Sequence, residues 1–321
     1  MKISNELVEA INNSNNVAIF IHVRPDGDCI GSGVALKLAL EQIGKHADIY
    51  CDGEVGKTFS YLKRVDTINK PTLKEYDTAI AVDVPTFNRI GCYADLYKSI
   101  KCRLNIDHHQ TNDKFGDIDL IDGTRASACE IIYELFVLMN LNITKEISEA
   151  LYTGIATDTG CFVHNNVQSV THIIAADLMN RGVDVGKINT IIFKNKSLGQ
   201  VELQKIALNH MQFYGKNKIC FTYLTKGDFT FAHCTPNDTV GLVDTFIGID
   251  GVEIGALISE DKPGICAVSI RSKGNINVST LAEYFGGGGH KNAAGCNIFG
   301  SARVAVKKLA KAVEEVYAGI Y

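Results

Sequence analysis

The sequence HVRPDGDCIGS, residues 22–32, decides the fold because it lies between an apolar strand and the start of a helix. The strand before it is VAIFI, residues 17–21, and the helical pattern after it runs from about Ile30 to Gly44. Further strands are expected at 47–51, 78–83 and 102–106, and helices near 127–140, 145–156 and 168–181. Short apolar strands that alternate with helices predict an α/β domain with a parallel, doubly wound sheet. Such sheets bind their ligands at the carboxyl ends of the strands.

The loop after the first strand contains three potential metal ligands, His22, Asp26 and Asp28. Carboxylates combined with an imidazole suit Mn²⁺, Mg²⁺ or Fe²⁺, whereas structural zinc sites favour thiolates. The same residues also suit an ordinary turn, because Asp and Gly are favoured in loops and Asp caps helices. This loop alone therefore leaves both interpretations open.

Two other strand ends and one helix end supply further candidates. Asp83 ends an apolar strand, the sequence Asp107-His108-His109 follows the strand CRLNI, and Asp158 lies at a helix end. Consecutive histidines point to opposite sides of an extended chain, so one can bind metal while the other faces a substrate. Together these positions predict one divalent-cation centre with six ligands: His22, Asp26, Asp28, Asp83, His108 and Asp158.

The composition is that of a folded protein of more than one domain. Its 321 residues favour two domains, and 46% hydrophobic against 21% charged residues predicts folding throughout. The ten cysteines form no Cys-x-x-Cys pair, which favours free thiols in a reducing compartment. The beginning of the chain has no apolar targeting segment, and no later apolar run reaches the roughly 20 residues of a membrane span. We therefore expect a soluble, cytoplasmic protein without membrane contact.

The second half of the sequence predicts a smaller α+β domain. Its expected strands lie near 218–224, 252–259 and 264–271, and its expected helices near 237–248 and 278–285. A polar helical pattern without a buried strand precedes them. The predicted organisation is a metal-binding catalytic domain at 1–185, a helical linker at 186–213 and a substrate-binding domain at 214–321.

Four motifs in order, HVRPDGDCIGS, VDVPTFNRIG, NIDHHQTN and GIATDTGCF, resemble those of the DHH phosphoesterase superfamily. The later FGGGGHKNAAG, residues 285–295, resembles the glycine-rich substrate loop of the associated DHHA1 domain, so the resemblance covers nearly the whole chain. Family II pyrophosphatases share the first four motifs but differ in their second domain. The size and two-domain plan most resemble the NrnA-like branch of bifunctional oligoribonucleases (nanoRNases) and pAp phosphatases.

The resemblance also implies a role for each candidate. One cation would be bound by His22, Asp26 and Asp83, and the other by Asp28, Asp83, His108 and Asp158, with Asp83 shared. The catalytic residues would be His109, beside the reacting phosphate, and Asp107, which would support it.

Two positions depart from the family pattern. Thr86 stands where many relatives carry an acidic residue, which leaves the role of that loop open. Cys29 stands where a small alanine is common, and we expect this replacement to be neutral.

Substrate binding is expected from one arginine of the first domain and from the second domain. The predicted substrate-binding residues are Arg89, Arg271, Ser272, Gly287, Gly288, Gly289 and His290. An arginine can bind phosphate through a bidentate fork, and glycines let backbone amides approach a phosphate closely. The simpler alternatives are a surface arginine at Arg89 and a flexible turn at the glycine run.

The resemblance implies a phosphoesterase that depends on two divalent cations, with Mn²⁺ expected and Mg²⁺ or Fe²⁺ as alternatives. Its partners would be short RNA oligonucleotides, dinucleotides such as pApA and pGpG, and pAp, which would yield AMP. A homodimer is compatible with the sequence. Two alternatives stay open, namely a phosphodiesterase of cyclic or linear dinucleotides such as c-di-AMP, and a non-catalytic nucleotide-binding protein.

Overall fold

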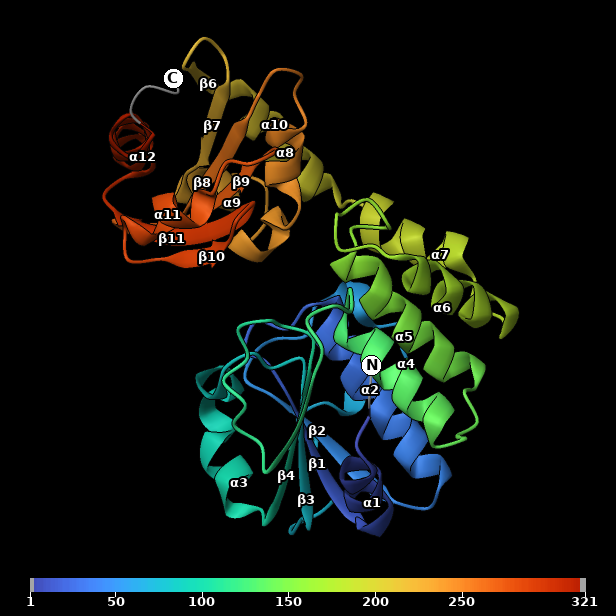
Figure 1. Cartoon of the computed structure of the whole chain (residues 1–321). Coiled ribbons are helices and arrows are strands. Elements are labelled where there is room, and N and C mark those ends of the chain that lie inside the picture. The colour runs from blue at the N-terminus through green and yellow to red at the C-terminus, as the bar shows by residue number, and fades with distance from the viewer. Residues whose placement is uncertain (1–2, 318–321) are drawn as a thin grey trace. The chain divides into compact units, whose positions relative to one another are not determined.

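The computed structural model describes residues 3–317, which form two compact units that divide between Asn195 and Lys196. Each unit contains its own β-sheet (Figure 1). The division falls inside the predicted linker, residues 186–213.

The sheet of the first unit is parallel throughout, with the strand order β2-β1-β3-β4-β5. Its strands are β1 (Asn16–Ile21), β2 (His46–Cys51), β3 (Thr78–Val82), β4 (Cys102–Asp107) and β5 (Ile118–Ile121). Alternate residues of β1 pack on opposite faces, with Val17 and Ile19 in the larger core and Ala18 and Phe20 in the smaller one. The predicted doubly wound parallel sheet is confirmed.

Helices cover both faces of this sheet. In Figure 1, α2, α4 and α5 lie together on one side of the strands and α3 on the other. The helices of the unit are α1 (Asn5–Asn13), α2 (Gly27–Gln42), α3 (Ala94–Ser99), α4 (Ala128–Leu138), α5 (Lys145–Asp158), α6 (Ser169–Asn180) and α7 (Val185–Asn189). All of the strand ends that carry candidate ligands therefore open at one edge of a sheet covered on both faces.

Helix α2 begins three residues earlier than its apolar pattern indicates. Asp26 is its N-cap, and one carboxylate oxygen of Asp26 accepts the backbone N–H of Asp28 and of Cys29. Asp28 and Cys29 consequently lie in the first turn of the helix, where helical geometry fixes the direction of their side chains.

Helices α2 and α5 cross in close contact because glycine occupies both sides of the crossing. A Cβ atom on Gly31 would lie 2.4 Å from the carbonyl oxygen of Ala150. A Cβ atom on Gly154 would lie 2.3 Å from the sulfur of Cys129 and 2.6 Å from Oδ1 of Asp28. The crossing therefore has no room for a methyl group on either helix.

We expect the substitution Gly31→Ala to destabilise the first unit by about 1–3 kcal/mol, because the new methyl group meets a backbone carbonyl that cannot rotate away. Gly186→Ala in α7 is the control, since its Cβ would meet nothing closer than 3.5 Å and alanine favours helix by about 0.5–1 kcal/mol. Urea denaturation followed by circular dichroism measures both. Equal stability of the two variants would contradict the close crossing.

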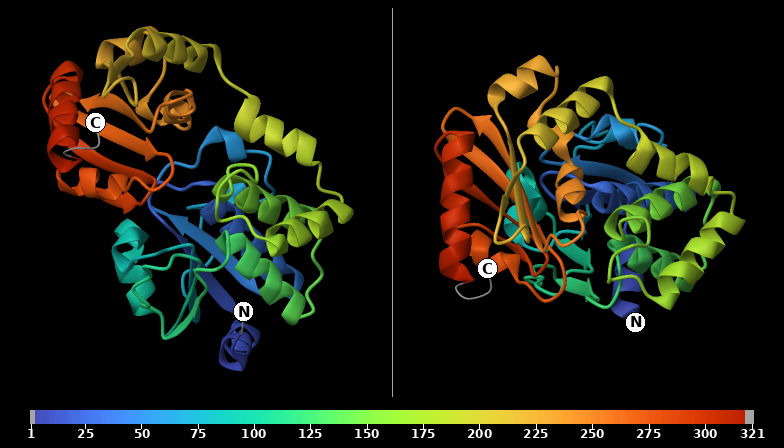
Figure 2. Two further views of the ribbon diagram at one scale, coloured as in Figure 1. Left: turned by 45° about the horizontal axis from the view of Figure 1, so that its top comes forward. Right: turned by 90° about the horizontal axis from the view of Figure 1, so that it is seen from above.

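The second unit is a mixed sheet between two helical layers, with the strand order β10-β11-β9-β8-β7-β6. Its strands are β6 (Gln212–Tyr214), β7 (Ile219–Leu224), β8 (Ile254–Lys262), β9 (Ile265–Ser272), β10 (Gly288–His290) and β11 (Ala293–Phe299). Its helices are α8 (Leu198–Asn209), α9 (Lys226–Phe231), α10 (Leu242–Ile247), α11 (Val278–Glu283) and α12 (Ala302–Val316). One face packs on α8, α9 and α10, and the other packs on α11 and α12 (Figure 2). The predicted α+β domain is confirmed.

One predicted helix of this unit is divided. The pattern at 237–248 forms a 3₁₀ turn, Pro236–Thr239, followed by α10. Gly241 between them has φ +76°, a left-handed conformation that interrupts a right-handed helix.

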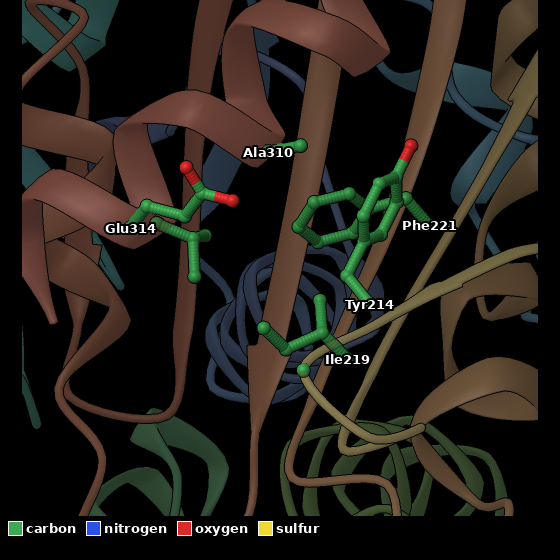
Figure 3. A pocket seen from close by; sticks show the side chains of 7 residues that line it. Tyr214, Ile219, Phe221, Ala310 and Glu314 are labelled. Atoms are coloured by element: carbon green, nitrogen blue, oxygen red, sulfur yellow. The ribbon is translucent and has the colours of Figure 1, made fainter. Parts of the chain in front are cut away.

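A small hollow lies beside Tyr214 and Phe221 of β6 and β7 and Ala310 and Glu314 of α12 (Figure 3). Its volume is about 50 Å³, far below the roughly 300 Å³ of a small-molecule pocket. We interpret it as imperfect packing under the sheet edge. Within residues 3–317, no helix combines the length and the apolar character needed to cross a membrane.

Candidate metal centre

The first ligand group forms where β1 runs into α2. His22 is 2% exposed, and its Nε2 lies 3.4 Å from Oδ2 of Asp26 and 3.6 Å from Oδ2 of Asp83. Asp26 keeps this second oxygen available because its first oxygen caps the helix. A buried imidazole nitrogen therefore faces two carboxylates that come from different loops.

Asp83 directly follows β3 and has φ 57°, a left-handed backbone conformation that costs a non-glycine residue of the order of 1–3 kcal/mol. Its backbone N–H is fixed by the carbonyl of Ile106, at 2.9 Å. Its side chain is buried, and its Oδ1 accepts no hydrogen bond from any described residue. A strained backbone that holds a buried, unpaired carboxylate oxygen indicates a functional role for this oxygen.

His108 brings together the second ligand group after β4. Its Nε2 lies 3.2 Å from Oδ2 of Asp158, 3.5 Å from Oδ1 of Asp83 and 3.8 Å from Oδ2 of Asp28. None of these contacts has hydrogen-bond geometry, and Nε2 is without another partner in the described structure. Nδ1 lies 3.3 Å from the carbonyl oxygen of Arg125, to which it donates, so in the neutral ring the lone pair of Nε2 faces the carboxylates.

The carboxylate of Asp28 is fully buried against the start of α4. The backbone N–H groups of Ala128 and Cys129 donate to its two oxygens, at 2.6 and 3.0 Å. Both amides belong to the first turn of α4, whose dipole favours a negative charge at this end. The sequence gives no signal of this contact, because the partners are a hundred residues apart and donate through their backbone.

The charges of the centre are poorly balanced within the protein alone. Burial raises the pKa of Asp28, and the Asp83 and Asp158 carboxylates raise it further. Burial lowers the pKa of His22 and of His108, but neighbouring groups outweigh it and hold both pKa values well above the usual value. These groups are Cys29 and then the carboxylates of Asp26 and Asp83 for His22, and carboxylates alone for His108. Burial raises the pKa of Asp83, but His108 and His22 more than reverse this effect. A bound cation would balance these carboxylates in place of protons on the histidines.

The donor set fits a centre of divalent cations. Nitrogen and carboxylate oxygen suit Mn²⁺, Mg²⁺ and Fe²⁺, and the buried oxygen of Asp83 and nitrogen of His108 that lack partners are suitable donors. The described residues contain three groups of potential ligands, and within each group the ligand atoms lie no more than 4.8 Å from one another. They are His22, Asp26, Cys29 and Asp83; Asp83, Asp107, His108 and His109; and Asp28, His108 and Asp158. All six predicted metal ligands belong to these groups.

His109 is oriented by a chain of hydrogen bonds that begins deeper in the protein. Oδ1 of Asp107 accepts the backbone N–H of His108 and the Nδ1–H of His109, both at 2.8 Å. Asn112 donates to Oδ2 of Asp107 at 2.6 Å and to the carbonyl of Val84 at 3.0 Å. The sequence analysis assigned no role to Asn112, although it closes the same motif.

We expect Asn112→Ala to destabilise the protein by about 1–3 kcal/mol, because it removes a donor from the buried Asp107 carboxylate. The exposed Asn165 gives a matched control, for which Asn165→Ala should stay within about 0.5 kcal/mol of the unchanged protein. Thermal unfolding of the two variants, in the presence of chelator, measures the difference. A loss at Asn112 no larger than at Asn165 would show that this network is not structural.

Arg89 lies against the back of the first ligand group. Its Nη2 is 3.0 Å from Nδ1 of His22 and 3.5 Å from the carbonyl oxygen of Val23. Val23 in turn donates its N–H to the carbonyl of Arg89, at 2.8 Å. The guanidinium therefore contacts a candidate ligand, and phosphate binding by Arg89 stays a prediction.

In the second unit, strand pairing aligns two of the predicted substrate-binding residues. Ala293 of β11 pairs with His290 of β10 on one side and with Arg271 of β9 on the other. Residues paired across neighbouring strands project to the same face, so the imidazole and the guanidinium flank a small alanine. Ser272 points elsewhere, because its hydroxyl donates to the carbonyl of Ile276 at 2.7 Å.

The structural constraint that favours glycine differs among the four positions of the run 286–289. A Cβ atom on Gly287 would lie 2.2 Å from the carbonyl oxygen of Gly295, and Gly289 has φ 149°. Gly286 has φ +73°. A Cβ atom on Gly288, by contrast, would meet nothing within 4 Å, so the fold does not require glycine there.

The two units match known family models in the same order. Residues 16–155 match the N-terminal domain of the DHH family, and residues 216–319 match the DHHA1 domain. The chain belongs to the DHH family of metal-dependent phosphoesterases.

Relatives similar to this chain cover nearly its whole length. The bifunctional oligoribonuclease and PAP phosphatase NrnA of Mycoplasma genitalium is 30% identical over 297 residues, which are 91% of this chain and 92% of that protein. The protein of the same name from Thermus thermophilus is 29% identical, over 94% of this chain and 89% of the relative. The crystal structure of an exopolyphosphatase-related protein from Bacteroides fragilis superposes with a TM-score of 0.91 at 26% identity and covers 97% of this chain and 95% of that one.

Proposed function

We propose that this protein hydrolyses short oligoribonucleotides, including dinucleotides such as pApA and pGpG, to mononucleotides, and converts pAp to AMP. The observation that carries the proposal is the buried centre around Asp83, whose unpaired oxygen lies among nitrogen and oxygen donors from three loops. Similarity over nearly the full length to proteins named oligoribonuclease and PAP phosphatase supports this choice of substrates. Such substrates are intracellular, which agrees with the expected cytoplasmic location.

We assign the ligands to two divalent cations, with Mn²⁺ as the expected ion. One cation is bound by His22, Asp26 and Asp83, and the other by Asp28, Asp83, His108 and Asp158. When bound, such cations supply Lewis acidity toward phosphate and lower the pKa of water. The start of α4 holds Asp28 in place through two amide hydrogen bonds, so this ligand needs little reorganisation.

His109 is the proposed catalytic residue that the chain itself contributes. The Asp107 carboxylate accepts its Nδ1–H at 2.8 Å and thereby fixes the orientation of the ring. The opposite ring nitrogen, Nε2, is proposed to interact with a phosphate oxygen or with the nucleotide oxygen that leaves. This arrangement stabilises charge as it develops on the departing oxygen.

The second unit is proposed to bind the nucleotide. In this division of labour, residues 1–185 catalyse, 186–213 connect and 214–321 bind substrate. Arg271 and His290 share one face of the sheet, where both can donate to a phosphate. Packing does not require glycine at position 288, because a Cβ atom there would meet nothing within 4 Å. We propose that the missing side chain instead lets the substrate approach the backbone closely. In the first unit, Arg89 is proposed to bind phosphate through the guanidinium nitrogens that do not face His22.

We expect Asp83→Asn to lower turnover of a five-nucleotide RNA and of pAp at least about 100-fold, because it removes the charge shared by both proposed cations. Asparagine tolerates a left-handed backbone, so the fold should persist. Asp95→Asn, an exposed position in α3, removes the same charge and should leave turnover unchanged. Removing metal with a chelator should abolish turnover in the unchanged protein, and Mn²⁺ should restore it.

The substrate panel for this experiment is pAp, pApA, a five-nucleotide RNA, cyclic di-AMP and pyrophosphate. Release of mononucleotides from the short RNA and of AMP from pAp is the expected result. Hydrolysis of cyclic di-AMP alone would replace the proposal with a cyclic-dinucleotide phosphodiesterase. Full activity in Asp83→Asn, or no turnover by protein with bound Mn²⁺, would overturn it.

We expect Arg271→Ala to raise KM for pApA roughly 10- to 100-fold with a smaller change in kcat, because a charged hydrogen bond to phosphate is lost. Lys307→Ala removes an exposed positive charge from α12 of the same unit and serves as control. Steady-state kinetics of both variants give the comparison. An unchanged KM in Arg271→Ala would remove this residue from the substrate site.

A further inference from the structure

We propose that the thiol of Cys29 is an additional ligand of the cation bound by His22, Asp26 and Asp83, and that it makes this position selective for thiophilic divalent cations. The inference rests on the proposed metal centre and concerns a residue that we expected to be neutral. It divides the centre into one position with a sulfur donor and one with only nitrogen and oxygen donors.

The start of α2 places this sulfur at the centre. Cys29 lies in the first helical turn, is fully buried, and follows the N-cap Asp26 by three residues. Its sulfur lies within 4.8 Å of a ring nitrogen of His22 and of a carboxylate oxygen of both Asp26 and Asp83. Typical bond lengths to a common ion are about 2.3 Å for sulfur and 2.0–2.2 Å for nitrogen and oxygen. Small adjustments of these side chains are sufficient to bring all four donors to one ion.

A second observation points to a ligand at this place. Oδ1 of Asp83 is buried and accepts no hydrogen bond from the described part of the chain. The thiol of Cys29 makes a long contact, 3.5 Å, to the carbonyl oxygen of Asp26 and also interacts with the imidazole of His22. Both the oxygen and the sulfur therefore lie among the side-chain donors of this group.

Two neighbouring cysteines show how a purely structural cysteine is placed. The sulfur of Cys51 contacts the carbonyl oxygen of His22, and that of Cys129 contacts the carbonyl oxygen of Asp28, each at 3.7 Å. Both are buried, yet neither belongs to a group of potential ligands within residues 3–317. Cys29 differs from them because its sulfur lies among side-chain donors.

The expected consequence is a difference in softness between the two cation positions. The group of Asp28, His108 and Asp158 contains no sulfur and suits Mn²⁺ or Mg²⁺. A thiolate favours Zn²⁺, Co²⁺, Cd²⁺ and Fe²⁺ over these ions. Coordination by Cys29 requires loss of its S–H proton, which passes to the solvent when the cation binds.

The test is titration of the full-length, chelator-treated and reduced protein with Co²⁺, followed by absorption spectroscopy. We expect visible d–d bands, which report Co²⁺ in a protein site, together with a near-ultraviolet band from sulfur-to-cobalt charge transfer. Cys29→Ala should lose the near-ultraviolet band and keep the visible bands. Cys51→Ala, a buried cysteine that also contacts His22, should keep both sets of bands.

A competition experiment with Cd²⁺ and Mn²⁺ gives a second readout. Cys29→Ala should weaken Cd²⁺ binding at least roughly tenfold while changing Mn²⁺ binding much less, because only the soft ion depends on sulfur. Cys29→Ser retains the size of the side chain with a hard hydroxyl and should reproduce both effects, which controls for misfolding of the alanine variant.

The outcomes separate this inference from the proposed function. Visible bands without a near-ultraviolet band, or a band that persists in both Cys29 variants, would overturn the role of Cys29 and leave the cation centre intact. Absence of any bound Co²⁺ would instead remove the centre itself, and the inference would fail with it.

Discussion

The accumulation of buried carboxylates at one edge of a parallel sheet is the constraint on which the first unit depends. Asp28, Asp83 and Asp158 approach the same imidazole, that of His108, within 3.8 Å. Carboxylates so close together repel one another and lose their hydration, so that they require either protons or cations nearby. Backbone amides from α4 stabilise the carboxylate of Asp28, whereas the left-handed backbone at Asp83 adds strain. This strain costs stability that a centre without chemistry would have no reason to retain.

Much of this architecture follows from patterns that are local in the sequence. Four of the five strands of the first sheet were expected within one residue of either end, because their apolar runs are buried on both faces. Since parallel strands end at one edge, the sequence also predicted that the residues after β1, β3 and β4 would gather there. The strand β5 was not predicted, because it has only the four residues IDLI and only one of them is buried.

The parts that the sequence did not predict depend on contacts between distant segments. The amides of Ala128 and Cys129 reach Asp28 across a hundred residues and leave no side-chain signature. The row formed by His290, Ala293 and Arg271 follows from antiparallel register, which alternation alone does not determine. Cys29 was expected to be neutral because a small alanine is common at this position among relatives, whereas the start of α2 places its sulfur among the side-chain donors.

The crossing of α2 and α5 also has a meaning for how this protein can vary. Gly154 looks like a glycine chosen for helix packing, but the space that its missing side chain leaves is filled by Oδ1 of Asp28 and the sulfur of Cys129. The helix packing and the proposed ligands are thus in direct contact at Gly154. Any side chain larger than glycine at this position of α5 would have to displace the carboxylate of Asp28. Evolutionary repacking of this core is therefore restricted by the geometry of the centre and not only by the stability of the fold.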